Sequence, residues 1–200
     1  MTELAKAGFT VVEDGGILLL TLTSPDGTNR LTANKVIALT KEIGAFSQRN
    51  PTLPLVITGE PVFSAGADLN EIARLDGPSA LTFAKMGQKL MSAVANYPTT
   101  VYAAIRGYCM GGGLDLALAC HRRIASPHAV FGHRGAALGL ITGWGGTQRL
   151  PRLVGKGKTL QMFAAAEKIH ATEALCIGLV DAVAEDPVAE AYRRISNFRS

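Results

Sequence analysis

The sequence predicts an α/β protein in which strands alternate with helices along most of the chain. The segments Leu55–Thr58 and Thr100–Ile105 are short apolar runs, which is typical of buried strands. Longer helical segments, Asn34–Asn50 and Pro78–Asn96, precede these strands, and a proline follows the end of each. Alternation of this kind indicates βαβ units and a mainly parallel sheet.

The remaining elements continue the alternation in chain order. The chain opens with a predicted hairpin, Phe9–Glu13 with Ile17–Thr23, because Asp14-Gly15-Gly16 is a turn signal between two apolar runs. The elements after Ile105 are then a helix at Gly112–Ala119, a strand at Arg122–Ala125, helices at Gly155–Ala166 and Thr172–Ile177, and a short strand at Leu179–Val183.

A glycine-rich turn, Gly111-Gly112-Gly113, joins an apolar segment to the Ala-rich helix that follows it. Glycines leave backbone N–H groups uncovered, and the first N–H groups of a helix have no partner within the helix. Such a turn can bind an anion or an oxygen that becomes anionic during a reaction. It can also be a tight turn that allows close packing, and this segment alone favours that second interpretation.

A second turn of small residues changes this balance. Ala65, Gly66 and Ala67 follow the predicted strand at 55–58 and precede a further helix, with Asp68 placed to cap that helix. Two such turns can bring two backbone N–H groups to one point, which is the arrangement of an oxyanion hole.

Four motifs in order resemble those of the crotonase (enoyl-CoA hydratase/isomerase) superfamily. They are Phe63-Ser64-Ala65-Gly66-Ala67-Asp68-Leu69; Gly107-Tyr108 with Gly111-Gly112-Gly113; Phe131-Gly132 with Leu138-Gly139-Leu140 and Gly143 to Leu150; and Gly178-Leu179-Val180. The resemblance extends from about Phe9 to Val183 and implies a spiral of ββα units. It also implies an acyl-CoA substrate, with coenzyme A entering as a thioester and not as a permanently bound cofactor.

The resemblance assigns site residues one by one. It implies that the N–H groups of Ala67 and Gly112 hold the thioester oxygen and stabilise an enolate. Ala65, Ala67 and Leu69 match the stretch that lies along coenzyme A, and Arg30 is placed to meet a phosphate.

Two positions depart from the family pattern. Hydratases of this family use two glutamates, which here match Asp115 and Gly135. Hydration needs one group to activate water and another to protonate the α-carbon, so efficient hydration is not expected. His133 is a second candidate acid or base, although a surface or packing role also fits it. An oxyanion hole with one carboxylate suits decarboxylation or thioester hydrolysis.

The resemblance divides the chain into a core at 1–183 and a short tail at 184–200. Family members continue beyond this point in helices that cover the site and build homotrimers or hexamers. The predicted C-terminal helical region is therefore shortened, which weakens the expectation of such an oligomer.

Composition agrees with one globular domain. The chain has 200 residues, 48% of them hydrophobic and 18% charged, with a mild net charge of +4. No basic tract with aromatic residues suggests nucleic acid, and no segment predicts a membrane span or a signal peptide. The three cysteines have no metal-site or disulfide spacing, so we expect no metal and a cytoplasmic location.

Two functions therefore follow from the sequence. The first is an acyl-CoA-transforming enzyme of hydratase, isomerase, decarboxylase or hydrolase type, with Ala67, Gly112, Asp115 and His133 as catalytic residues. The second is a non-catalytic relative that binds acyl-CoA or a protein partner. Intact glycine turns favour the first, whereas Gly135 and the short C-terminal region favour the second.

Overall fold

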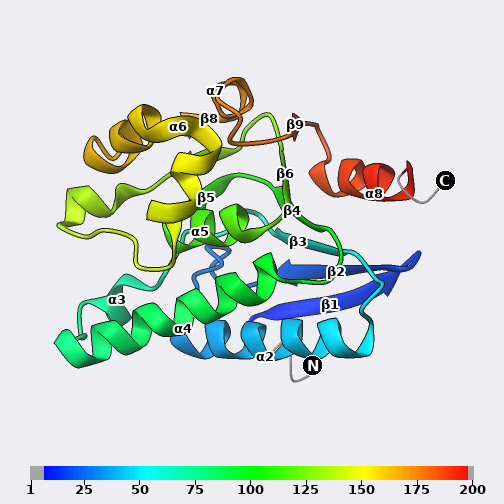
Figure 1. Ribbon diagram of the computed structural model, residues 1–200, viewed down its shortest axis with the longest axis horizontal. Helices are drawn as coiled ribbons and strands as arrows, with labels where there is room; N and C mark the ends of the chain where they lie inside the picture. The colour runs from blue at the N-terminus through cyan, green and yellow to red at the C-terminus, as the bar shows by residue number, and fades with distance from the viewer. Residues whose placement is uncertain (1–6, 198–200) are drawn as a thin grey trace.

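A six-stranded sheet forms the centre of the protein, with a three-stranded sheet beside it (Figure 1). The computed structural model describes residues 7–197, so the outermost parts of the predicted core and tail, 1–6 and 198–200, lie outside it. The strands of the large sheet, in spatial order, are β1 (Phe9–Asp14), β2 (Ile17–Leu22), β3 (Leu55–Gly59), β4 (Val101–Ile105), β6 (Arg122–Ala125) and β9 (Ala182–Val183).

The predicted βαβ organisation is present in the large sheet. Strands β1 and β2 form the antiparallel hairpin, and every later strand pairs in parallel with its neighbour. Parallel neighbours need crossover connections. Here these contain α2 (Ala33–Arg49), α4 (Gly77–Ala95) and α5 (Gly112–Ala119).

Apolar side chains cover both faces of the large sheet because successive strand residues point to opposite sides. Ile57 belongs to the core beneath α4 and α5, whereas Val56 packs with Ala191 and Ile195 on the other face. Ala191 and Ile195 come from α8 (Pro187–Asn197), which packs on β4 and β6. The sheet therefore lies between two layers of helix (Figure 1).

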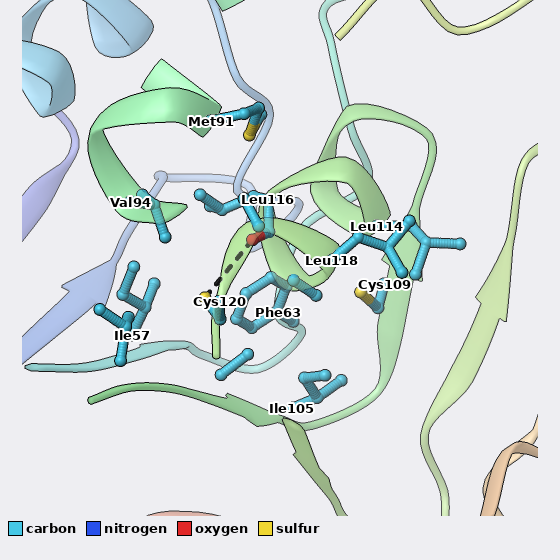
Figure 2. Packing of buried hydrophobic residues seen from close by; sticks show 14 of the residues in the cluster. Ile57, Phe63, Met91, Val94, Ile105, Cys109, Leu114, Leu116, Leu118 and Cys120 are labelled. Carbon is cyan, nitrogen blue, oxygen red and sulfur yellow. Dashed lines mark hydrogen bonds between the residues drawn. The ribbon is translucent and has the colours of Figure 1, made fainter. Parts of the chain in front are cut away.

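Helix α5 is buried around its whole circumference, which explains its almost uniformly apolar sequence. Figure 2 shows Leu114, Leu116 and Leu118 of this helix packed between α4 and the strands. The Cys120 thiol at its end donates a hydrogen bond of 3.4 Å to the Leu116 carbonyl. A helix buried in this way holds its first turn in a fixed position.

The small sheet was not predicted. It consists of β5 (Tyr108–Met110), β7 (Val130–Gly132) and β8 (Ile169–His170), and these strands are too short to show a clear alternation. Its position matters for the site because β5 leads directly into the glycine turn at 111–113. Two short elements also follow the turns that line the site: α3 (Leu69–Ile72) and the 3₁₀ helix η1 (Arg134–Leu138).

The C-terminal third differs most from the sequence prediction. Helix α6 (Gly146–Ala164) begins well before the predicted start at Gly155, where the backbone is non-helical at φ 80° and kinks the helix. Helix α7 (Ala171–Cys176) matches its prediction to within one residue at each end, whereas β9 is shorter than the predicted strand at 179–183. Within residues 7–197, no helix is both long and apolar enough to cross a membrane.

Candidate active site

Two backbone turns meet beside a cavity of about 480 Å³. One turn leaves β3 through Gly66, and the other leaves β5 through Gly111; their φ angles of 97° and 51° favour glycine. A β-carbon at Gly66 would lie 3.1 Å from the Gly112 nitrogen, and one at Gly112 would lie 3.3 Å from the Ala67 nitrogen. The two turns are therefore in direct contact.

Ala67 and Gly112 both line the cavity. Gly112 is the first residue of α5, where an N–H group has no partner within the helix. Within residues 7–197, neither N–H group donates to an acceptor of the chain. Two uncommitted donors in adjacent turns can hold one oxygen atom and stabilise negative charge that develops on it.

Ser64 stabilises the first turn and is not placed as a nucleophile. Its side chain is fully buried and donates a hydrogen bond of 2.8 Å to the Asn29 carbonyl. The same hydroxyl accepts a hydrogen bond from the Gly66 N–H at 3.1 Å. With both contacts made inside the protein, Ser64 holds the loop at 64–67 against the segment at 28–31.

Asp115 is the acidic residue of the cavity lining and lies in the first turn of α5. Its side chain is 1% exposed. One oxygen, Oδ2, accepts a hydrogen bond from the Thr142 hydroxyl, and the other, Oδ1, lies 3.2 Å from His133 Nε2. The His133 side chain is itself 4% exposed and packs against the Phe163 ring.

The Asp115 and His133 contact is close without being aligned as a hydrogen bond. Within the described part of the chain, neither Asp115 Oδ1 nor His133 Nε2 has a hydrogen-bond partner. Buried polar atoms are rarely left without one, and active sites are among the exceptions. A carboxylate and an imidazole with this unused capacity can accept a proton from a substrate or donate one to it.

Gly146 makes this pair possible. It is the first residue of α6, and a β-carbon there would lie 2.3 Å from Asp115 Oδ1 and 2.9 Å from His133 Nε2. Only glycine leaves room for the start of α6 to approach both side chains. The positive end of that helix therefore faces the Asp115 carboxylate.

Gly135 lines the same cavity with backbone alone. It lies in η1, and its carbonyl accepts a hydrogen bond from the Leu140 N–H at 2.8 Å. A β-carbon at Gly135 would lie 2.7 Å from the Leu140 carbonyl oxygen, which is closer than real β-carbons approach. The folding of this loop thus favours glycine at position 135.

Apolar side chains form most of the cavity wall. Trp144 lies at the inner side, 3% exposed, with its Nε1 donating to the Phe83 carbonyl at 3.2 Å. The indole fits between two glycines: a β-carbon at Gly87 would lie 2.1 Å from Nε1, and one at Gly112 would lie 2.5 Å from Cζ3. The other apolar residues of the lining are Ala65, Ala67, Leu69, Ile72, Leu75, Ala80, Phe83, Ala84, Met110, Leu138, Leu140 and Ile141.

Most of the residues predicted from the sequence line this one cavity: Ala65, Ala67, Leu69, Gly112, Asp115 and His133. Arg30 does not line it, and its guanidinium lies 3.3 Å from the Asp26 carboxylate on the surface. Asp68 caps α3, as expected, by accepting hydrogen bonds from the N–H groups of Asn70 and Glu71.

Thr142, Trp144 and Gly146 contact the site but were not assigned to it from the sequence. Trp144 lies inside the third motif, and Thr142 directly precedes it. A threonine carries no chemical signature of its own, so only the folded loop reveals that its hydroxyl contacts Asp115.

A scan of protein families matches residues 13–197 to the enoyl-CoA hydratase/isomerase model. Among curated proteins, a short-chain-enoyl-CoA hydratase of Clostridium acetobutylicum is 36% identical over 175 residues, which cover 86% of this chain and 67% of that protein. A probable enoyl-CoA hydratase of Bacillus subtilis is 46% identical over 134 residues, covering 66% of this chain and 52% of that protein. The matched region therefore spans about half to two thirds of these relatives.

Solved structures of enoyl-CoA hydratases have the same fold as this chain. An enoyl-CoA hydratase from Thermoplasma volcanium superposes with a TM-score of 0.91 at 32% identity, covering 98% of this chain and 79% of that one. DspI from Pseudomonas aeruginosa gives 0.88 at 36% identity, covering 96% and 74%. The predicted α/β crotonase fold is confirmed by these superpositions. The chain belongs to the enoyl-CoA hydratase/isomerase family, also called the crotonase superfamily.

Proposed function

We propose that this chain is an acyl-CoA-transforming enzyme that stabilises a thioester enolate. Two residues whose N–H groups are uncommitted, Ala67 and Gly112, line a cavity that Asp115 and His133 also line, and this observation carries the proposal. The family membership supports a coenzyme A thioester as the substrate.

The two N–H groups are proposed to hold the thioester oxygen. When the α-carbon loses a proton or a nucleophile adds to the β-carbon, negative charge moves onto this oxygen. Donors that are already oriented stabilise such charge without reorganising, and each contributes about 3–4 kcal/mol to lowering the barrier. Asp68 and Ser64 support this step indirectly, since both fix the backbone on either side of Ala67.

Asp115 and His133 are proposed to move the proton. Asp115 is oriented by Thr142 on one oxygen and presents the other toward His133. The pair can thus place one acid and one base on the same side of the substrate. Because Gly135 has no side chain, a water molecule would be activated by this pair alone, so hydration is expected to be slower than in a two-glutamate enzyme.

Coenzyme A is proposed to lie along Ala65, Ala67 and Leu69, the wall formed by the first turn and α3. The backbone bridge between Leu31 and Ala67 brings the segment of Arg30 next to this wall. Arg30 can reach a phosphate only by exchanging its contact with Asp26, and an exposed ion pair of this kind costs little to break.

The test is a panel of acyl-CoA thioesters incubated with the protein and read by mass spectrometry for gain of water, loss of CO2, or release of free coenzyme A. Asp115→Asn and His133→Gln should each abolish most turnover. Asp14→Asn and His128→Gln change the same residue types at exposed sites outside the cavity lining and should leave turnover intact. Binding of acyl-CoA without turnover of any panel member would identify the non-catalytic alternative instead.

A further inference from the structure

Arg134 is an exposed cation of the cavity lining. Within residues 7–197, no carboxylate lies in ion-pair distance of its guanidinium, and no acceptor takes a hydrogen bond from it. Arg106 and Arg123 are engaged by carboxylates. Arg74 and Arg152 are also exposed, but they do not line the cavity. A guanidinium forms its strongest contacts with carboxylates and phosphates, so Arg134 is available for an anionic ligand.

The cavity itself cannot supply that anion. Asp115 is the one acidic side chain of the lining, and its two oxygens face Thr142 and His133. The residue next to Arg134 is Gly135, which carries no side chain. Arg134 is itself exposed beside the apolar lining, so an ion pair formed there is partly screened by water.

The position of Arg134 distinguishes between the two possible anions on an acyl-CoA. Arg134 directly follows His133, so their Cα atoms are about 3.8 Å apart, beside the proposed proton-transfer pair. The proposed coenzyme A wall, by contrast, consists of Ala65, Ala67 and Leu69 on a different loop. His133 is buried and Arg134 is exposed, so a group bound to Arg134 would lie at the exposed side of the loop that holds His133, and not on the loop of the proposed coenzyme A wall.

We infer that the acyl group of the substrate carries its own carboxylate and that Arg134 binds it. This inference rests on the proposed function, since it needs the thioester to occupy the oxyanion turns. Arg134 would then be a specificity-determining residue: it selects dicarboxylic acyl-CoA esters over simple fatty acyl-CoA esters. The bond formed is ionic, so it sets affinity without taking part in the proton transfer.

The experiment compares pairs of saturated thioesters that have the same acyl carbon number, succinyl-CoA with butyryl-CoA and glutaryl-CoA with valeryl-CoA. Saturated chains have no double bond to hydrate, and once mass spectrometry shows that no free coenzyme A is released, isothermal titration reports binding. We expect the wild type to bind the dicarboxylic member of a pair about two- to fivefold more tightly, as one exposed ion pair provides. Arg134→Gln should remove this preference and leave butyryl-CoA binding unchanged, and Arg134→Lys should retain part of it because lysine keeps the charge but not the planar fork.

Arg152→Gln is the matched control, because Arg152 is exposed on α6 and does not line the cavity. Equal affinity of the wild type for both members of each pair would overturn the inference while leaving the proposed function intact. An Arg134→Gln variant that weakens all four thioesters equally would also overturn it, because Arg134 would then contact the phosphates of coenzyme A. Failure of the wild type to bind any thioester would overturn the proposed function together with this inference.

Discussion

Gly112→Ala tests the proposed oxyanion hole at the point where its geometry is tightest. The added β-carbon would lie 2.5 Å from Trp144 Cζ3 and 2.7 Å from Cε3, so either the indole or the first turn of α5 must move. The Trp144 indole cannot move away freely, because Gly87 packs against its other side and its Nε1 donates a hydrogen bond to the Phe83 carbonyl. We therefore expect the Gly112 nitrogen to be displaced.

This displacement should lower both kcat and the free energy of unfolding. Removing one oxyanion donor lowers kcat by about 10²–10³-fold, and Gly112→Ala should approach that loss. Overpacking in a filled core costs about 1–3 kcal/mol of unfolding free energy. Turnover is measured on a substrate found with the thioester panel, and stability by urea unfolding.

Gly44→Ala and Trp144→Ala provide the controls. A β-carbon at Gly44 in α2 meets no atom within 4 Å, so Gly44→Ala should stabilise the helix slightly and leave turnover unchanged. If the indole causes the strain, Gly112→Ala should cost less stability when Trp144→Ala is already present. Unchanged kcat and unchanged stability in Gly112→Ala would refute the described packing and the donor role together.

Other predictions concern the Asp115 carboxylate, a side chain at position 135 and the buried Cys120 thiol. Asp115→Asn should lower turnover by about 10²–10⁴-fold with little change in acyl-CoA affinity, and equal turnover would remove Asp115 from the mechanism. Gly135→Glu should lose about 1–3 kcal/mol of stability without gaining fast crotonyl-CoA hydration, because its β-carbon collides with the Leu140 carbonyl; a stable, fast hydratase would contradict this. Burial raises the pKa of Cys120 from 9.0 to about 12, so the folded state retains a proton that the unfolded state releases in that range. The stability that the protonated Cys120 thiol contributes is complete below pH 9 and is lost as the pH rises toward 12. Between pH 9 and 12, the free energy of urea unfolding should therefore depend less on pH in Cys120→Ala than in the wild type.

The long elements of the protein were predictable from the sequence because each has a strong local signal. Pro51 and Pro98 follow the ends of α2 and α4, and the apolar runs of β3 and β4 are continuous. The small sheet was not predictable, since its short segments become strands only by pairing: Val130–Gly132 pairs with Tyr108–Met110 on one side and with Ile169–His170 on the other. Tertiary contacts decide such short segments.

The site was predictable as far as backbone motifs define it. Glycines that need positive φ or close approach leave a visible pattern, and the turns at Gly66 and Gly111 follow it. The role of Gly146 was not recognised, because its constraint comes from Asp115 and His133, which are distant in sequence. The role of Thr142 was not recognised either, because its contact, Asp115, is also distant in sequence.

The arrangement around Asp115 explains how one carboxylate can remain buried beside an apolar cavity. Burial without partners would be costly, but Thr142 binds one oxygen and the start of α6 faces the other. His133 then lies close enough to exchange a proton while remaining outside ideal hydrogen-bond geometry. Because Gly135 has no side chain, the proposed proton transfer in this cavity would depend on the Asp115 and His133 pair, and the proposed substrate selection on Arg134. Under these proposals, proton transfer by His133 and charge recognition by Arg134 would belong to adjacent residues of one loop.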